Sequence, residues 1–341
     1  MIELKGITKT FNPGTVNENT VLKDFNLTLN EGDFITVIGG NGAGKSTLLN
    51  IISGAIEADS GMILLNNVDV SSMREHQRAP YFGHVFQDPM RGTAPDMTVL
   101  ENLALAYGRG RSRSLFRWSI RPQDKDYYVN ELKSLGLGLE NKMHQKVGLL
   151  SGGQRQALTL LMATMSQKPS HRKILKEYVM FSMSDKEAAK KEVNEVYVAS
   201  KKEYQNKKKA LLKDKSLPND EKRRLIKEAY KEFDDKVRKY DLTNPVLLLD
   251  EHTAALDPKT AEKVLTITET MVKERNITTI MITHNMKDAI KYGNRLIMMS
   301  KGKIVVDVNG EEKKKLTIED LLEKFTLASD EMLSDSTILG D

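Results

Sequence analysis

The sequence contains no cysteine, which excludes disulfide bonds and metal sites built from thiolates. It also has no run of about 18 apolar residues, so we expect no segment to span a membrane. Its first five residues lack the charged and then apolar pattern of a secretory signal peptide. Neither sign of charge dominates, because the net charge is +5 over 341 residues. The composition predicts a soluble cytoplasmic protein of mixed α/β type, and the length of 341 residues is enough for one large or two modest domains.

The most informative segment is a glycine-rich loop. Residues 39–47 match the phosphate-binding pattern G-x-x-x-x-G-K-[ST]. The apolar residues 34–38 before it predict a buried strand, and residues 48–52 after it continue at helical spacing. In such a loop the glycines let successive N–H groups face phosphate oxygens, and the new helix adds its positive dipole end. We expect Lys45 to reach the β- and γ-phosphates of a nucleotide and Ser46 to bind Mg²⁺.

The residues before this loop alternate between apolar and polar. Residues 1–38 predict short antiparallel strands that are interrupted by turns at residues 12–14 and 30–32. Phe11 precedes the first turn and has two interpretations. Its ring could stack on an adenine, whereas a core position is the commoner place for a single aromatic residue.

A second helix start has the character of an anion-binding site. Residues 150–154 read L-S-G-G-Q and open a helix that is predicted to continue to about residue 167. Ser151 can cap this helix, and Gly152 and Gly153 expose its first N–H groups. A cap alone would explain Ser151 but not the paired glycines.

Two carboxylates follow an apolar strand. The apolar residues 246–249 are followed by Asp250 and Glu251. A carboxylate at the end of a buried strand usually meets a metal or a cation. Asp250 fits a Mg²⁺ shell, and Glu251 fits a base that positions an attacking water molecule. The next predicted strand, residues 278–283, delivers His284 to the same sheet edge as the phosphate-binding loop, where ligands of parallel sheets bind.

Taken in order, these motifs closely resemble those of the ATP-binding subunit of an ABC transporter. The similarity covers residues 1–167 and 244–325. Its motifs are Walker A (39–47), the Q-loop glutamine Gln87, the signature (150–154), Walker B (246–250) with Glu251, the D-loop (254–257) and the H-loop His284. The segments 86–92, 148–164 and 250–259 resemble the subgroup described as tryptophan/tyrosine-type in particular.

The resemblance implies a fold and a mode of nucleotide binding. The fold is the α/β P-loop NTPase fold of ABC ATPases, with a mixed sheet core, an antiparallel β subdomain and an α-helical subdomain at about residues 90–167. ATP would lie between Walker A of one copy and the signature of a second copy, in a head-to-tail homodimer. The implied nucleotide-binding residues are Phe11, Gly39, Asn41, Gly42, Gly44, Lys45, Ser46, Thr47, Ser151, Gly152, Gly153, Gln154 and Asp257.

The resemblance also implies a catalytic group and partners. Ser46, Gln87 and Asp250 would surround Mg²⁺, Glu251 would polarise water, and His284 would contact the γ-phosphate. Gln87 would couple the site to an integral membrane permease. A separate extracytoplasmic substrate-binding lipoprotein is implied as well, for import of an amino acid or another small solute. The subunit would then lie peripherally at the cytoplasmic face of the cell membrane.

Three positions depart from the commonest family pattern. Gly40 is often another residue, His252 is usually proline, and Ala254 is often serine. None of these changes removes a catalytic group. The missing serine hydroxyl at the D-loop weakens the expectation of cross-subunit contacts there.

The largest departure is an insertion between the signature helix and Walker B. Residues 168–243 hold 22 Lys and Arg against 14 Asp and Glu, a net charge of +8 that leaves −3 for the rest of the chain. Residues 184–187 match a capping box, and residues 216–220 form a break. Apolar or aromatic positions recur at helical spacing on both sides of this break: Val193, Tyr197, Tyr204 and Leu211, then Ile226, Tyr230, Phe233, Val237 and Tyr240.

The insertion therefore predicts a basic, coiled-coil-like hairpin of two antiparallel helices, followed at the end of the chain by a loose tail at residues 326–341. As a docking arm, the hairpin would bind a partner protein, an anionic lipid surface or nucleic acid. The alternative is a solvated hairpin without a partner, which is typical of charge runs.

Other functional classes agree less well with this organisation. A soluble ABC ATPase that acts on ribosomes usually carries two cassettes, whereas this chain has one. DNA-repair relatives separate Walker A from the signature by hundreds of residues, whereas about a hundred separate them here. A scaffold without hydrolysis is opposed by the presence of both Lys45 and Glu251.

Overall fold

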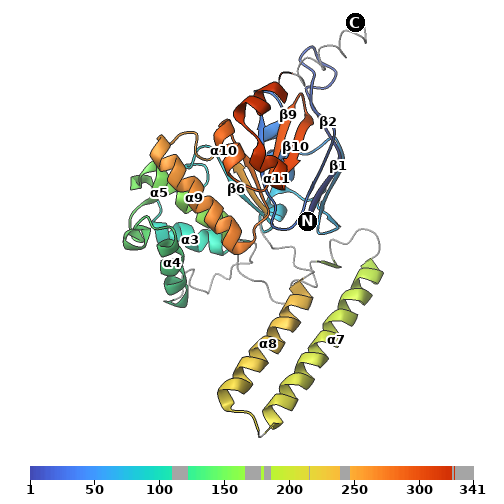
Figure 1. Cartoon of the computed structure of the whole chain (residues 1–341), viewed down its shortest axis with the longest axis vertical. Coiled ribbons are helices and arrows are strands. Elements are labelled where there is room, and N and C mark those ends of the chain that lie inside the picture. Colours follow the sequence, from blue (N-terminus) through green and yellow to red (C-terminus); the bar gives the residue numbers. More distant parts are fainter. Residues whose placement is uncertain are drawn as a thin grey trace. The chain divides into compact units, whose positions relative to one another are not determined.

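The computed structural model describes residues 1–109, 122–165, 178–179, 186–214, 216–238, 246–324 and 326 (Figure 1). The chain divides into two compact units. One unit comprises residues 1–63, 71–167 and 245–341, and the other comprises residues 64–70 and 168–244. Within the described residues, no helix combines the length and the apolar character needed to cross a membrane.

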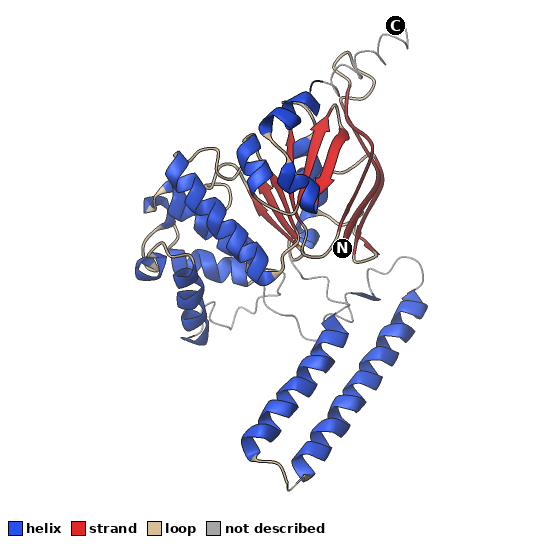
Figure 2. Cartoon of the chain, viewed as in Figure 1, coloured by secondary structure: helices blue, strands red, loops and turns tan. Residues whose placement is uncertain are grey.

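The core of the first unit is a six-stranded mixed sheet with the strand order β10-β9-β3-β8-β7-β6 (Figure 2). Its strands are β3 (Phe34–Gly39), β6 (Phe82–Val85), β7 (Val246–Asp250), β8 (Thr279–Ile282), β9 (Arg295–Ser300) and β10 (Lys303–Asn309). All neighbouring pairs are parallel except β9 and β10, which form an antiparallel hairpin. Strands β7 and β8 are almost wholly apolar and buried, as expected for parallel strands covered on both faces.

A smaller sheet has the order β2-β1-β4-β5. Its strands are β1 (Ile2–Phe11), β2 (Asn19–Leu29), β4 (Ser60–Leu65) and β5 (Val68–Asp69). Strands β1 and β2 pair antiparallel, which confirms the predicted arrangement of the N-terminal strands. The connection between them is longer than predicted and includes all of residues 12–18.

Helices of the first unit supply most of its remaining core. They are α1 (Lys45–Ser53), α2 (Glu75–Arg78), α3 (Val99–Tyr107), α4 (Pro122–Ser134), α5 (Gly152–Thr164), α9 (Pro258–Arg275), α10 (Met286–Lys291) and α11 (Gly310–Lys315), with 3₁₀ turns at Leu139–Lys142 and Val147–Leu149. Leu103 of α3, Leu132 of α4 and Leu158 of α5 are fully buried in one cluster with Leu247 of β7. This cluster fixes α5, and therefore the signature, relative to the Walker B strand.

The end of one helix differs from the sequence expectation. Helix α5 ends at Thr164 rather than near residue 167, because Met165 leaves the helical conformation. Near the end of the described chain, residues 318–324 are helical, and so is residue 326. Most of the predicted tail, residues 327–341, lies outside the described residues.

In the second unit, α7 (Lys186–Lys213) and α8 (Asn219–Arg238) lie side by side (Figure 1). They are antiparallel, because Glu203 pairs with Lys236 while the later residue Lys207 pairs with the earlier Glu232. The hairpin predicted for the insertion is therefore present. The predicted capping residues Ser184 and Asp185, and the seam residue Tyr240, lie outside the described residues.

Among the described residues, the seam between these helices differs from the predicted one on both helices, because Ser200 of α7 is buried as well as Ala229 of α8. Val193, Phe233 and Val237 are buried as predicted, but Tyr230 is 46% exposed and Ala229 is buried in its place. A helix with only one partner buries a narrow stripe. The bulky ring of Tyr230 therefore lies at the edge of the seam, while the small side chain of Ala229 faces the other helix.

Candidate active site

Positive φ angles at three glycines shape the loop between β3 and α1. Gly39, Gly42 and Gly44 have φ angles of 153°, 79° and 93°, which L side chains rarely adopt. At Gly39 a Cβ atom would lie 2.2 Å from the carbonyl oxygen of Met299, so no larger residue fits. The tip of the loop, Asn41 and Gly42, is exposed and can be approached from solvent.

Lys45 is the first residue of α1 and folds back over the loop. It is 6% exposed, and its Nζ donates to the carbonyl oxygens of Gly39 at 2.8 Å and Gly40 at 3.0 Å. Burial lowers the pKa of Lys45, and the nearby charges of Glu251 and Asp250 oppose this shift. The buried ammonium and the uncapped first amides of α1 together favour a bound anion.

Asp250 ends β7 opposite this loop. Its Oδ1 accepts a hydrogen bond of 3.2 Å from the hydroxyl of Ser46. Burial raises the pKa of Asp250, while the hydrogen bond from Ser46 opposes the shift. Strands β7 and β3 are not neighbours in the sheet, since β8 lies between them. Ser46 reaches Asp250 from the first turn of α1.

The oxygens of Ser46 and Asp250 are suited to Mg²⁺, which takes one or two protein oxygens and completes its shell with substrate phosphates and water. The described residues contain no group of three or more His, Cys, Asp or Glu that could hold a metal by themselves. The donor set therefore fits a Mg²⁺ ion shared with a nucleotide better than a cage made only of protein.

Glu251 and His284 lie together at the same edge. The Nε2 atom of His284 is 2.5 Å from Oε1 of Glu251, and the imidazole is 48% exposed. Glu251 has a left-handed backbone with a φ of 47°, and its N–H donates to the carbonyl oxygen of Ile282 in β8. The structure thus brings the base and the histidine expected from the sequence into direct contact.

The signature residues make a different set of contacts. Ser151 caps α5 by accepting from the N–H of Gln154, as predicted, and the Gln154 side chain donates to the carbonyl oxygen of Leu137. A Cβ atom at Gly153 would lie 2.3 Å from Cγ2 of Thr260, so this glycine also allows close packing of α5 on α9. Among the described contacts, none joins residues 151–154 to Lys45 or Asp250.

The remaining predicted residues are spread around this edge. Gln87 is exposed just after β6, and Thr47 is half-buried in α1. Phe11 is half-buried at the end of β1, with Nζ of Lys9 5.7 Å from its ring centroid. Asp257 caps α9, because its Oδ1 accepts from the N–H of Thr260 at 3.1 Å, and this hydrogen bonding lowers the pKa of Asp257. Within one subunit, Asp257 therefore has a structural role.

One residue beside the site was noted in the sequence only as a departure from proline. His252 is 2% exposed, and its Nε2 lies 3.2 Å from the hydroxyl oxygen of Thr268 in α9. Burial lowers the pKa of His252 to about 4, so the ring is neutral at neutral pH. Because His252 directly follows Glu251, this buried contact anchors the backbone that carries the carboxylate. Only the missing proline could have pointed to it.

A pocket of about 350 Å³ opens beside Glu251 and His284, and sequence analysis missed it as well. Its lining includes Asp288 and Lys291 of α10. Burial raises the pKa of Asp288, whereas Lys291 opposes the shift. These residues carry no motif, and only the folded structure brings them to the same pocket as residues of α9.

His84 of β6 lies three residues before Gln87. Its ring centroid is 4.2 Å from that of Phe86, and its Nε2 is buried without a hydrogen-bond partner in the part of the chain that the structure describes. Burial lowers the pKa of His84 to about 4, and the charge of Arg91 adds to this effect. The strand that leads to Gln87 therefore contains an imidazole that stays neutral.

Comparisons with known proteins agree on one family. The family model described as ABC transporter matches residues 22–171. A tyrosine transport ATP-binding protein of Clostridioides difficile is 35% identical over 96% of this chain and 100% of its own length. A phosphonates import ATP-binding protein of Lactococcus lactis is 26% identical over 95% of this chain and 99% of its own. The dimeric structure of a bacterial ABC transporter cassette matches with a TM-score of 0.58 and 23% identity, covering 91% and 98% of the two chains.

We expect His84 to make the protein less stable in acid. In the unfolded chain a histidine has its ordinary pKa of 6.5, whereas the folded pKa is about 4, so the unfolded state binds more protons between these values. Stability therefore falls as the pH decreases through this window. Between pH 6.5 and pH 4.5, this difference in proton binding lowers the free energy of unfolding by about 2 kcal/mol.

Urea unfolding at several pH values measures this effect. His84→Leu removes the titrating group, so its free energy of unfolding should change less between pH 6.5 and pH 4.5 than that of the unaltered protein. His76→Gln, at an exposed histidine, is the control and should keep the full pH dependence. Equal slopes for the unaltered protein and His84→Leu would contradict the prediction.

Proposed function

Because the chain belongs to the ATP-binding subunits of ABC transporters, we propose that its charged sheet edge binds ATP with Mg²⁺ between two head-to-tail copies. The activity of such a subunit is hydrolysis of ATP, coupled to transport through a membrane permease. The observation that carries the proposal is the convergence of Lys45 and Asp250 with the Glu251–His284 pair at one edge.

Each group at this edge has a defined role in the proposal. Lys45 and the loop N–H groups hold the β- and γ-phosphates, and the ring of Phe11 stacks on adenine. The other loop positions that contact the nucleotide are Gly39, Asn41, Gly42, Gly44 and Thr47. Ser151, Gly152, Gly153, Gln154 and Asp257 would contribute from the second copy, since their contacts within one subunit lie away from Lys45.

Ser46 and Asp250 would hold the Mg²⁺ ion, with Gln87 as a third ligand. When bound, the ion neutralises negative charge that develops on the transferred phosphoryl group. The exposed position of Gln87 after β6 also suits contact with a permease.

Glu251 would accept a proton from the attacking water or orient it. His284 holds the Glu251 carboxylate, and its exposure leaves the imidazole accessible to a γ-phosphate. His252 fixes the backbone on the other side of Glu251 through its contact with Thr268. The carboxylate is therefore held from two directions before ATP arrives, which lowers the cost of organising the reaction.

We infer that the transporter imports an amino acid or a similar small solute. The name of the relative from Clostridioides difficile specifies tyrosine transport, and that of the relative from Lactococcus lactis specifies phosphonate import. The inferred partners are a permease and an extracytoplasmic substrate-binding lipoprotein, with this subunit at the cytoplasmic face of the membrane. Action on a ribosome or nucleic acid is not favoured, since these relatives are transport proteins.

We also propose the division of the chain that the sequence indicates. Residues 1–167 and 244–325 form the ATPase domain, residues 168–243 form the inserted hairpin, and residues 326–341 form the tail. The insertion binds a further protein or an anionic lipid surface.

We expect Glu251→Gln to reduce the kcat of ATP hydrolysis about 100-fold or more, because an amide cannot take the proton of the water. ATP should still bind, since Lys45 and the loop are unchanged. Phosphate release and binding of a fluorescent ATP analogue measure the two properties. Glu274→Gln makes the same charge change at an exposed position of α9 and should leave both unaltered. Full hydrolysis by Glu251→Gln would refute the assigned role.

We expect His252→Ala to lower kcat about tenfold with little change in the KM for ATP, because the carboxylate of Glu251 loses its fixed position. Thr268→Val removes the partner of His252 and should act in the same direction. His252→Gln can still bond to Thr268 and should restore part of the rate. A change in KM without a change in kcat would show that His252 does not position Glu251.

A further inference from the structure

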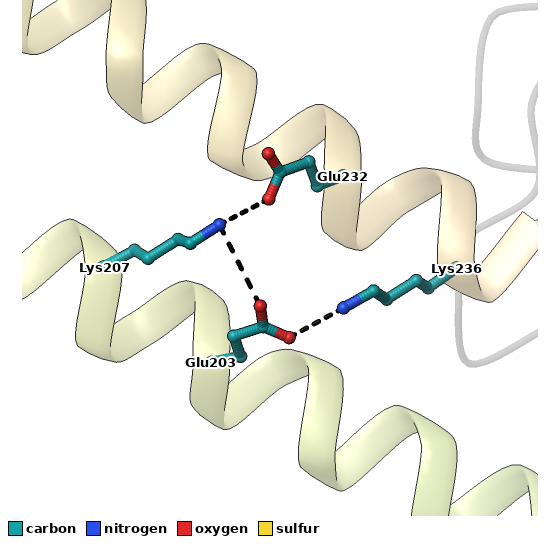
Figure 3. A network of polar contacts seen from close by, with 4 residues as sticks. All are labelled: Glu203, Lys207, Glu232 and Lys236. Carbon is teal, nitrogen blue, oxygen red and sulfur yellow. Dashed lines mark hydrogen bonds and ion pairs between the residues drawn. The ribbon is translucent and has the colours of Figure 1, made fainter.

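The two edges of the α7–α8 hairpin differ in charge. On one edge, four charged residues form a neutral chain of ion pairs across the helices (Figure 3). Lys207 lies 2.6 Å from Glu232 and 3.9 Å from Glu203, and Lys236 lies 2.7 Å from Glu203. Every cation on this edge is therefore matched by a carboxylate.

The opposite edge of α7 carries lysines over aromatic rings. Nζ of Lys201 is 5.3 Å from the ring centroid of Tyr197, and Nζ of Lys208 is 5.9 Å from that of Tyr204. Lys201 and Lys208 are seven residues apart, two turns of one helix, so they lie on the same side. Lys190 precedes Lys201 by three turns and lies on that side as well.

Helix α8 contributes to the same edge. The ring of Tyr230 lies 5.6 Å from that of Tyr204, which places Tyr230 beside the lysines of α7. Arg223 and Lys227 precede Tyr230 by seven and three residues and share its side of α8. We call the five cations of this edge the basic strip: Lys190, Lys201, Lys208, Arg223 and Lys227.

The charge of the basic strip is largely unmatched within the described residues. All five cations are exposed. Arg223 has a loose pair with Asp220 at 3.8 Å, and none of the other four lies within ion-pair distance of a described carboxylate. By helical spacing, two acids lie on this side of α8: Asp220, three residues before Arg223, and Asp234, four residues after Tyr230. One edge of the hairpin is thus neutral, and the other carries an excess of positive charge.

We propose that the basic strip docks the hairpin on an anionic phospholipid surface. The cations extend over about 27 Å along α7, from Lys190 to Lys208, in a line rather than around a pocket. Such a line complements many separate headgroup phosphates better than one small anion. The neighbouring tyrosines have the apolar ring and polar hydroxyl that favour the headgroup layer. The proposal rests on the proposed function, which places the chain beside a membrane.

The outer face of α7 provides a matched comparison. Lys202 and Lys209 are also exposed and seven residues apart, but each lies one position further along the chain than Lys201 and Lys208. One position rotates a side chain by about 100° around the helix. A bilayer in contact with the basic strip would then be further from Lys202 and Lys209, and salt screens charges over about 10 Å at 0.1 M.

The test is sedimentation of the full-length protein with vesicles of phosphatidylcholine, with and without phosphatidylglycerol. The unaltered protein should bind only the vesicles that contain phosphatidylglycerol, and less so at high salt. Lys201→Glu with Lys208→Glu should weaken binding at least about tenfold. Lys202→Glu with Lys209→Glu makes the same change in net charge and should weaken binding less than about threefold.

Three results would overturn the proposal. They are no preference for anionic vesicles, equal losses in the two double variants, and a preference for an RNA oligonucleotide over the vesicles. Arg223→Glu with Lys227→Glu on α8 should reproduce the loss, and circular dichroism confirms that each variant keeps its helices. ATP hydrolysis by the same preparations is independent of the basic strip, so it separates failure of this proposal from failure of the proposed function.

Discussion

The structure depends on charges of both signs that are partly buried at one edge of a parallel sheet. Burial lowers the pKa of Lys45 and raises that of Asp250, so desolvation opposes the charged form of each group. Among the described residues, the Lys45 ammonium donates hydrogen bonds to the carbonyl oxygens of Gly39 and Gly40, which carry no net charge. A phosphate group would supply the missing negative charge to Lys45, and a divalent cation would supply positive charge to Asp250. Both charges therefore suit the nucleotide and the metal that we propose for this edge.

The rest of the first unit holds this edge in place. Parallel pairing from β6 to β9 brings several strand ends together. The close approach of Gly39 to the carbonyl oxygen of Met299 leaves no room for a side chain at position 39. His252 and His284 fix Glu251 from its backbone and its carboxylate. The signature at the start of α5 instead packs on α9, which fits a role toward a second copy.

Local patterns in the sequence predicted much of this arrangement. The loop glycines, the Ser151 cap, and the strands that end in Asp250 and His284 depend on neighbouring residues or on the parallel pairing of apolar segments, both of which a sequence displays. The contact of His252 with Thr268 and the tight fit of Gly153 on Thr260 depend on how α9 packs, which no local pattern records. The burial of Ala229 in the hairpin seam, where Tyr230 was predicted, has the same origin. Heptad spacing does not say how wide a stripe of one helix its partner covers. Helical spacing does show, however, that Lys190, Lys201 and Lys208 share one side of α7.

Pairing of two copies by ATP is the central claim, and sedimentation velocity of Glu251→Gln tests it most directly. The variant keeps Lys45 and the phosphate-binding loop but should hydrolyse ATP very slowly, so bound ATP persists. We predict a dimer with ATP and Mg²⁺, and a monomer with ADP or without nucleotide. A second variant, with residues 170–243 also replaced by a short linker, should dimerise equally if the ATPase domain alone carries the pairing. A monomer under all conditions, with ATP bound, would contradict the account.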